Sequence, residues 1–153
     1  MTAQISRRAL LVAMAAACAT PLRAASPGIH VVKDPDCTCC GAWIDHLQAE
    51  GFPTTVEVRA LAELASYKAR MGIPEALVSC HTATVEGYVL EGHVPAADIR
   101  RLLTERPEAL GLAVPGMPYG APGMGPEDAR DAYDVILIQR DGRASVFTRY
   151  PAA

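Results

Sequence analysis

Residues 111–126 carry four prolines, five glycines and two methionines in one uninterrupted segment. Proline removes a backbone hydrogen-bond donor and glycine adds conformational freedom, so this density of both excludes a helix or strand of any length. The segment follows a region of alternating strand and helix patterns and precedes two β-prone runs. We therefore expect one domain over residues 26–110, with an extension over residues 111–153 that packs on the same domain.

Local patterns on either side of this segment predict the regular elements. β-prone residues between turn signals predict four early strands, at 28–33, 54–58, 76–79 and 83–90. Apolar residues at helical spacing before glycine or proline predict three helices, which begin at Cys39, Leu61 and Pro95. Asp141-Gly142 lies between β-prone runs at 133–139 and 144–150 and predicts a hairpin. This order of elements predicts an α/β fold in which helices pack on a small mixed sheet.

The N-terminal residues have the pattern of an export signal. Arg7 and Arg8 precede an apolar run over residues 9–19, and Pro21 and small residues follow. The run is too short to span a bilayer, which needs about 20 apolar residues. The paired arginines also resemble a twin-arginine signal. We expect residues 1–25 to be a signal peptide that is removed on export to the periplasm, without stable membrane insertion.

Composition limits the classes of protein that the chain can form. Its 153 residues are 50% hydrophobic and 20% charged, which excludes a wholly disordered chain and allows one domain. The formal net charge of -3 argues against binding to nucleic acid. Removal of residues 1–24 takes away three arginines and no acidic residue, so the charge becomes -6. This acidity favours a cationic ligand.

Three cysteines lie within four positions, Cys37-Thr38-Cys39-Cys40, between the first expected strand and the first expected helix. Cys37 and Cys40 have the spacing of a redox dithiol, whose thiol pKa a helix N-terminus lowers. A dithiol needs only two sulfurs, however, so the third thiol favours a metal site. Adjacent helical residues point about 100° apart, so Cys39 and Cys40 suit several bridged ions better than one. Thiolates select Cu(I), zinc or iron–sulfur clusters, and export disfavours the last.

The residues alone leave alternatives open. Exported proteins use disulfides readily, so Cys37 can pair with Cys40, or either of them with Cys80. A structural zinc site fits the same thiols. A thiol–disulfide oxidoreductase that uses Cys37 and Cys40 on protein substrates is a further hypothesis. The last alternative is a passive metal-binding module or chaperone without redox turnover.

Five other side chains extend the candidate metal site. Cys80 supplies a fourth thiol, and His81 beside it can bind a metal or contact a sulfur. His93 follows a β-prone run, from which a loop can project it toward the site. Met117 and Met124 lie in a loop with little core to fill, and the methionine thioether is a ligand that suits Cu(I).

The two remaining histidines are not expected to bind the metal. His46 lies on the same helix face as Cys39 but roughly 10 Å along the axis, too far to share one ion. His30 lies on the expected first strand, before the cysteines, and we interpret it as a structural or exposed residue.

Four separated motifs resemble a known bacterial family, the exported copper-resistance proteins called CopG, which are unrelated to the ribbon-helix-helix repressors of that name. These motifs are DCTCC at 36–40, SCHTA at 79–83, EGHVP at 91–95 and GLAVPGMP at 111–118. The resemblance covers nearly the whole mature chain, roughly residues 29–150, and no motif residue is missing.

The resemblance implies a thioredoxin-like domain with a C-terminal extension that helps to bind metal. It also implies a cluster of several copper ions bridged by cysteine sulfurs. The implied role is copper tolerance, as a copper oxidoreductase that interconverts Cu(I) and Cu(II) alongside efflux components, with an electron donor, as a monomer. We expect Cys37, Cys39, Cys40 and Cys80 to form the thiolate core. His81, His93, Met117 and Met124 are then expected as peripheral ligands or a lid.

Overall fold

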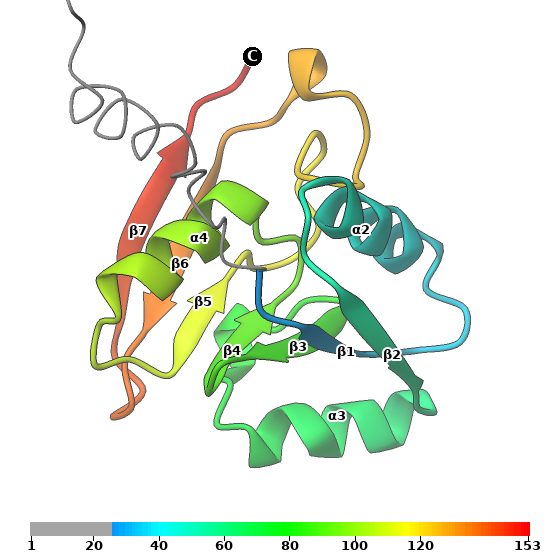
Figure 1. Ribbon diagram of the computed structural model, residues 1–153, viewed down its shortest axis with the longest axis vertical. Coiled ribbons are helices and arrows are strands. Elements are labelled where there is room, and N and C mark those ends of the chain that lie inside the picture. The colour runs from blue at the N-terminus through cyan, green and yellow to red at the C-terminus, as the bar shows by residue number, and fades with distance from the viewer. Residues whose placement is uncertain (1–25) are drawn as a thin grey trace, which may run out of the picture.

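The computed structural model describes residues 26–153, and the expected signal peptide over residues 1–25 lies outside them. Seven strands form one sheet in the order β2-β1-β3-β4-β5-β6-β7 (Figure 1). The strands are β1 (Ile29–Lys33), β2 (Thr54–Val58), β3 (His81–Val85), β4 (Tyr88–Glu91), β5 (Gly111–Ala113), β6 (Tyr133–Ile138) and β7 (Ala144–Tyr150). The α-helices are α2 (Thr38–Ala49), α3 (Leu61–Arg70) and α4 (Ala96–Glu105).

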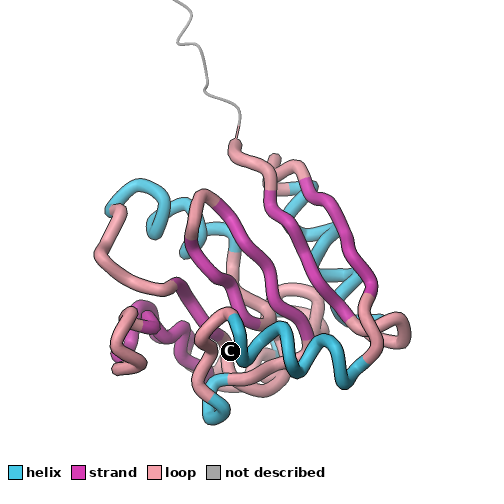
Figure 2. The backbone as a smooth tube through the Cα atoms, turned by 90° about the horizontal axis from the view of Figure 1, so that it is seen from below, coloured by secondary structure: helices cyan, strands magenta, loops and turns pink. Residues whose placement is uncertain are grey.

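The first four strands have a thioredoxin-like arrangement. Strand β1 pairs parallel with β2 through the α2 crossover, and it pairs antiparallel with β3 on its other side. Strands β3 and β4 form an antiparallel hairpin. The expected α/β fold, a mixed sheet flanked by helices, is therefore confirmed. Figure 2 shows the strands side by side between helical segments.

The two faces of the sheet are covered by different helices. Register aligns Val31, Ala83, Leu90 and Leu112 across four strands. These side chains join one buried apolar cluster with residues of α2 and α4. The opposite face lies against α3, where Lys68 donates a hydrogen bond to a threonine of β3 (Figure 1). The central strands β3 and β4 are therefore buried on both faces, as their apolar sequences require, whereas the edge strands β2 and β7 are largely exposed.

The sequence predictions for residues 76–90 are wrong in two details. The β-prone run over 83–90 contains two strands, because Glu86 and Gly87 both have positive φ and turn the chain back. The run over 76–79 forms no strand, and a 3-10 turn occupies Glu75–Leu77 instead. Pro74 immediately precedes this turn, where proline suits a helical start and cannot donate to a sheet.

Strand β5 corrects the expectation that residues 111–126 contain no strand. A Cβ atom on Gly111 would lie 1.8 Å from the carbonyl oxygen of Val89 in β4. Glycine here permits a close backbone approach, and Leu112 and Ala113 then pair with both β4 and β6. The element is three residues long and depends on its neighbours in the sheet, which local composition does not reveal.

The extension after β5 continues the same sheet. Strand β6 pairs antiparallel with β5, and β7 pairs antiparallel with β6 at the edge. The predicted hairpin is confirmed, with Gly142 at a φ of 83° in its turn. Across residues 26–153, no helix has the length and apolar character needed to cross a membrane.

Candidate metal centre

The three clustered cysteines lie where strand β1 ends and helix α2 begins. Cys37 occupies the N-cap position, and Cys39 and Cys40 lie in the first turn. The N–H of Cys37 donates to the carbonyl of Asp34 at 3.3 Å, which closes the turn that leads into the helix. The sulfurs therefore lie at the positive end of the helix dipole, which stabilises thiolates.

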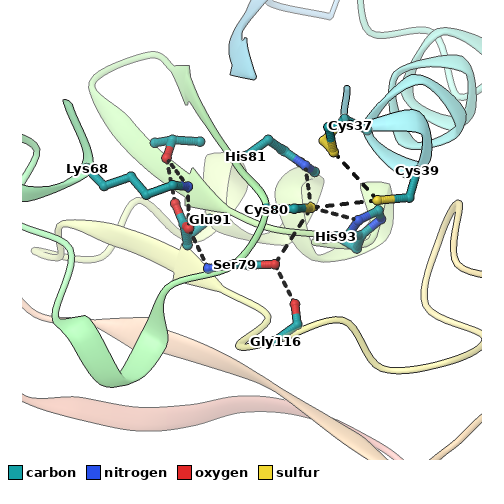
Figure 3. Close-up of polar contacts among 11 residues, drawn as sticks. Cys37, Cys39, Lys68, Ser79, Cys80, His81, Glu91, His93 and Gly116 are labelled. Atoms are coloured by element: carbon teal, nitrogen blue, oxygen red, sulfur yellow. Dashed lines mark hydrogen bonds and ion pairs between the residues drawn. A yellow bond between two sulfur atoms is a disulfide. The ribbon is translucent and has the colours of Figure 1, made fainter. Parts of the chain in front are cut away.

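Sheet pairing brings Cys80 to the same place (Figure 3). Lys33, the last residue of β1, pairs with His81, the first residue of β3. Cys80 precedes His81 and therefore lies beside the start of α2. The Sγ atom of Cys39 lies 3.9 Å from that of Cys80 and 3.6 Å from that of Cys37. The ligand atoms of all four cysteines lie within 4.8 Å of one another.

Cys37 and Cys40 form a disulfide, while Cys39 and Cys80 are free thiols. Of the alternative pairings considered from the sequence, this one is present in the structure. Cys40 is fully buried, and Cys37 is half-buried. The four sulfurs are gathered in the disulfide form, and all four can act as thiolate ligands only after the disulfide is reduced.

Cys80 belongs to a second ligand group, which contains His81 and His93. Its Sγ atom lies 3.3 Å from Nδ1 of His81 and 3.2 Å from Nε2 of His93. Burial, reinforced by the neighbouring Cys39, raises the pKa of the Cys80 thiol to about 11. The metal-free thiol is therefore protonated at neutral pH, and metal binding there must displace a proton.

Both histidines are held in the neutral form that binds metals. Burial lowers the pKa of His93 and lowers that of His81 further. Nδ1 of His93 lies 2.7 Å from the carbonyl oxygen of Pro122, which can only accept, so Nδ1 carries the proton. The lone pair of His93 Nε2 then faces Cys80. In metal sites, a hydrogen bond from the other ring nitrogen commonly fixes the tautomer and the orientation of a histidine ligand in this way.

His81 has a polar atom without a partner. Its Nε2 atom is buried and makes no hydrogen bond within the described part of the chain. The indole ring of Trp43, from α2, packs against the imidazole at 4.3 Å between centroids. Trp43 in turn donates from Nε1 to the carbonyl of Val94. The imidazole is therefore fixed by packing, with one nitrogen facing Cys80.

The glycine- and proline-rich loop closes around these ligands. Ser79 Oγ donates to the carbonyl of Gly116 at 2.5 Å, and the Pro122 carbonyl holds His93. Met117 is 58% exposed on this loop, and Met124 is half-buried. The loop thus contacts the ligand groups at two points, while metal ligation by the two methionines stays a prediction.

The other two histidines lie in neither ligand group. Nε2 of His46 accepts a hydrogen bond from the backbone N–H of Ala96 at 3.4 Å, which links α2 to the start of α4. His30 is partly exposed and contacts Glu57 at 3.2 Å on β2. Their exclusion from the metal site stays a prediction.

Sequence reasoning missed several groups that shape the site. Ser79 contacts the Cys80 sulfur at 3.9 Å, and Glu91 accepts a hydrogen bond from the Ser79 backbone. The Pro122 carbonyl is a backbone group, so no residue type reveals it. The EGH sequence at 91–93 was a signal for Glu91, because an acidic residue followed by glycine ends a strand otherwise composed of apolar residues.

Comparison with known proteins supports a specific family. A family model described as "Protein of unknown function, DUF411" matches residues 77–124, and no curated protein sequence matches the chain. Two solved structures, called "Copper resistance protein copG- Form 1" and "Form 2", are 48% identical, each with a TM-score of 0.77. They align over 83% and 82% of this chain and over 100% and 99% of their own. The chain therefore belongs to the CopG family of copper resistance proteins.

Proposed function

We propose that the chain is an exported, periplasmic copper-binding protein that contributes to copper resistance. The observation that carries this proposal is the convergence of four cysteine sulfurs within 4.8 Å of one another. Similarity to copper resistance proteins over most of the chain supports the choice of copper over other soft metals. Zinc, silver and mercury would bind the same thiols, so the proposal concerns the metal handled in the cell.

The reduced site holds more than one copper ion. Cys39 and Cys40 leave adjacent positions of α2 about 100° apart, which favours sulfurs that bridge neighbouring ions over a single shared ion. The sulfurs of Cys37 and Cys80 lie 3.6 and 3.9 Å from that of Cys39, and all four cysteine sulfurs lie within 4.8 Å of one another. A sulfur in such a compact group can bridge two ions, and we propose a cysteine-bridged polynuclear cluster.

The histidines and methionines complete the copper site at its edge. His93 and His81 offer neutral imidazole, which suits Cu(II) as well as Cu(I). Met117 and Met124 lie on the loop that contacts Ser79 and His93, and we propose that their thioethers capture Cu(I) or cover the cluster. The exposed position of Met117 fits a role in capture.

Interconversion of Cu(I) and Cu(II) requires a partner for the electrons, and the Cys37–Cys40 pair supplies one. When two Cu(II) ions are reduced to Cu(I), each takes one electron, and the two thiols form a disulfide and release two protons. A dithiol donor must then reduce the disulfide before the next cycle. The protein is proposed to act as a monomer that exchanges copper with periplasmic efflux components.

Anaerobic titration of the reduced mature protein with Cu(I) tests the copper cluster. We expect tight binding of more than one Cu(I) per chain and loss of this uptake in Cys39→Ala. His30→Ala, which changes a partly exposed histidine outside the ligand groups, serves as the control and should bind as the wild type does. Failure of the reduced wild-type protein to bind copper would exclude the proposed function.

A second candidate function, thiol–disulfide exchange with protein substrates, is favoured by the disulfide at the N-terminus of α2. Cys40 is buried, so an incoming thiol must attack the half-buried Cys37. A Cys40→Ala variant would then retain a mixed disulfide between Cys37 and its substrate. Recovery of that adduct, together with reductase activity in metal-free protein, would favour exchange over copper handling.

A further inference from the structure

A buried ion pair lies on the face of the sheet that α3 covers. Lys68 of α3 contacts Glu91 of β4 at 2.7 Å, and their side chains are 7% and 0% exposed (Figure 3). Lys68 also donates to the hydroxyl of Thr82 at 2.9 Å. This charge pair belongs to neither ligand group, and the copper proposal does not use it.

Such a pair is poorly explained by stability alone. Two charges lose their hydration on burial, and apolar residues of similar volume often stabilise a protein as well or better. The strands here do not depend on the pair, because β3 and β4 are joined by a continuous backbone ladder. The contacts of the carboxylate suggest another role.

The Glu91 carboxylate holds the chain on both sides of Cys80. Oε1 accepts a hydrogen bond from the backbone N–H of Ser79 at 2.6 Å. Oε2 accepts one from the hydroxyl of Thr82 at 2.6 Å. Ser79 immediately precedes Cys80, and Thr82 follows it by two positions. A single buried carboxylate therefore fixes both ends of the Ser79–Thr82 segment.

The segment that leads from Glu91 to His93 is also held close to Ser79. Glu91 is followed by Gly92, whose φ is 72° and whose N–H donates to the carbonyl of His81 at 3.0 Å. A Cβ atom on Gly92 would lie 2.5 Å from Ser79 Oγ, so the two segments are in close contact. Cys80 and His93 thus lie on two chain segments that are in contact with each other and that both adjoin the Glu91 carboxylate.

We propose that Glu91 is a positioning residue of the copper site: its carboxylate, whose buried charge Lys68 balances, holds the Cys80 sulfur at the separation from Cys39 and His93 that copper bridging requires. This inference rests on the proposed copper function. Lys68 holds the carboxylate in place and balances its negative charge. Glu91 anchors the two segments, and neither side chain touches the metal. Second-shell partners of metal ligands typically contribute about 10- to 100-fold in metal affinity.

Two double variants of matched shape separate positioning from stability. Lys68→Met/Glu91→Gln removes both charges but keeps a side-chain oxygen that can accept from Ser79. Lys68→Met/Glu91→Met has nearly the same volume and removes that acceptor. Each reduced variant is titrated anaerobically with Cu(I) against a competing chelator, and its thermal unfolding is measured without metal. Thiolate-to-copper absorbance in the near ultraviolet reports the cluster itself.

We expect the glutamine variant to bind Cu(I) with an affinity close to the wild type. The methionine variant should bind about tenfold or more weakly, with altered absorbance, while thermal unfolding shows that both variants are folded at the temperature of the titration. Equal affinity and absorbance in the two folded variants would overturn the positioning role while leaving the copper function intact. A wild-type protein that binds no copper would overturn both proposals.

Thr82→Val provides a second route if the methionine variant does not fold. It leaves the ion pair in place and removes one of the contacts that Glu91 makes beyond Cys80. We expect weaker Cu(I) binding and changed cluster absorbance with the Lys68–Glu91 pair intact. Unchanged affinity and absorbance in this folded variant would overturn the proposal.

Discussion

Cys80 is the side chain that connects the two ligand groups. Its sulfur lies near the sulfur of Cys39 and near one ring nitrogen each of His81 and His93. Metal ions bound by thiolates and metal ions bound by imidazole would therefore share this one atom. Since burial raises its pKa to about 11, the atom changes from thiol to thiolate only when a metal or a base takes its proton.

The raised pKa of Cys80 predicts a proton released on copper binding. Below pH 11, metal binding at this sulfur displaces one proton, so the apparent affinity increases about tenfold for each unit by which the pH rises. In Cys80→Ser the pH dependence of Cu(I) affinity should fall by about one proton per chain between pH 6.5 and 8.5. Competition titrations measure the slope, with His30→Ala as control, and an unchanged slope in Cys80→Ser would contradict the prediction.

Neutral His81 and His93 predict that the metal-free protein loses stability in mild acid. Their pKa values lie below 6.5 in the folded state, so as pH falls below 6.5 the unfolded chain binds protons that the folded chain does not. The free energy of unfolding should therefore decrease by at most about 1.4 kcal/mol per pH unit for each histidine. It should not change through these groups above pH 6.5.

Urea unfolding between pH 7.5 and 5.5, followed by the fluorescence of Trp43, measures this dependence. A His81→Gln variant cannot bind the proton in either state and should show a smaller slope. A wild-type protein whose stability stays constant or rises on acidification through this range would show that the imidazoles are not buried in neutral form.

At the scale of elements, the loop over residues 114–126 depends on glycines with different surroundings. Gly123 has a φ of 82°, and a Cβ atom there would lie 2.6 Å from the backbone nitrogen of Trp43 in α2. Gly116 has a φ of 68°, and a Cβ atom there would meet nothing within 4 Å. Glycine is thus required at position 123 both by the close contact with α2 and by the left-handed backbone conformation.

Alanine at these two positions should therefore have unequal effects. Both variants force a non-glycine residue into the left-handed region at a cost of about 1–2 kcal/mol, but only Gly123→Ala must also move the loop away from α2. We expect it to lose more stability in chemical unfolding and to weaken Cu(I) binding through the neighbouring Pro122–His93 hydrogen bond. Equal losses of stability and affinity in Gly123→Ala and Gly116→Ala would contradict a docked loop.

Local signals account for most elements but not for all of them. The three helices have apolar faces and clear stop residues, and the terminal hairpin has an Asp-Gly turn, so the sequence predicts them. Strand β5 has no such signal, because its strand character comes from the close approach of Gly111 to β4. The turn at Glu86 was missed for a related reason, since a positive φ at a non-glycine residue is imposed by the hairpin around it.

At the scale of the molecule, one apolar cluster joins both parts of the chain. Leu112, Val114 and Val135 pack with Val31 and Leu90 of the first four strands. Residues after 110 thus contribute core side chains to the same layer as residues before it. We expect the domain over 26–110 and the extension over 111–153 to unfold together, as a single cooperative unit.

Leu112→Ala tests this cooperativity. The leucine is fully buried, so its truncation should lower the free energy of unfolding by about 2–5 kcal/mol. The transitions seen by Trp43 fluorescence and by far-ultraviolet circular dichroism should still coincide. Val146→Ala on β7 changes a side chain that is 42% exposed and should shift stability by less than about 0.5 kcal/mol. Two separated transitions would show that the extension unfolds independently.

The candidate site could be predicted from sequence only as a set of chemical groups. Thiol and imidazole side chains can be recognised as metal ligands from the sequence, so Cys80 and His93 could be proposed as partners of the cysteine motif. Their distances depend on the pairing of β1 with β3, and the choice of Cys37 with Cys40 as the disulfide depends on those distances. The Lys68–Glu91 pair lies on the opposite face of the sheet and reaches the site only through the Ser79 backbone N–H and the Thr82 hydroxyl.

The distribution of the ligands along the chain also fixes an order of events in time. Residues 37–40, 80–81 and 93 meet only after β1 has closed on β3 and β3 on β4. Before that, a newly made chain offers incoming ions the Cys37–Cys40 motif without Cys80 and the histidines, and the full group of candidate ligands exists only once the sheet has formed. Under the proposed copper function the full site is loaded only after folding, and each ion retained there stabilises the closed sheet by mass action against the unfolded chain.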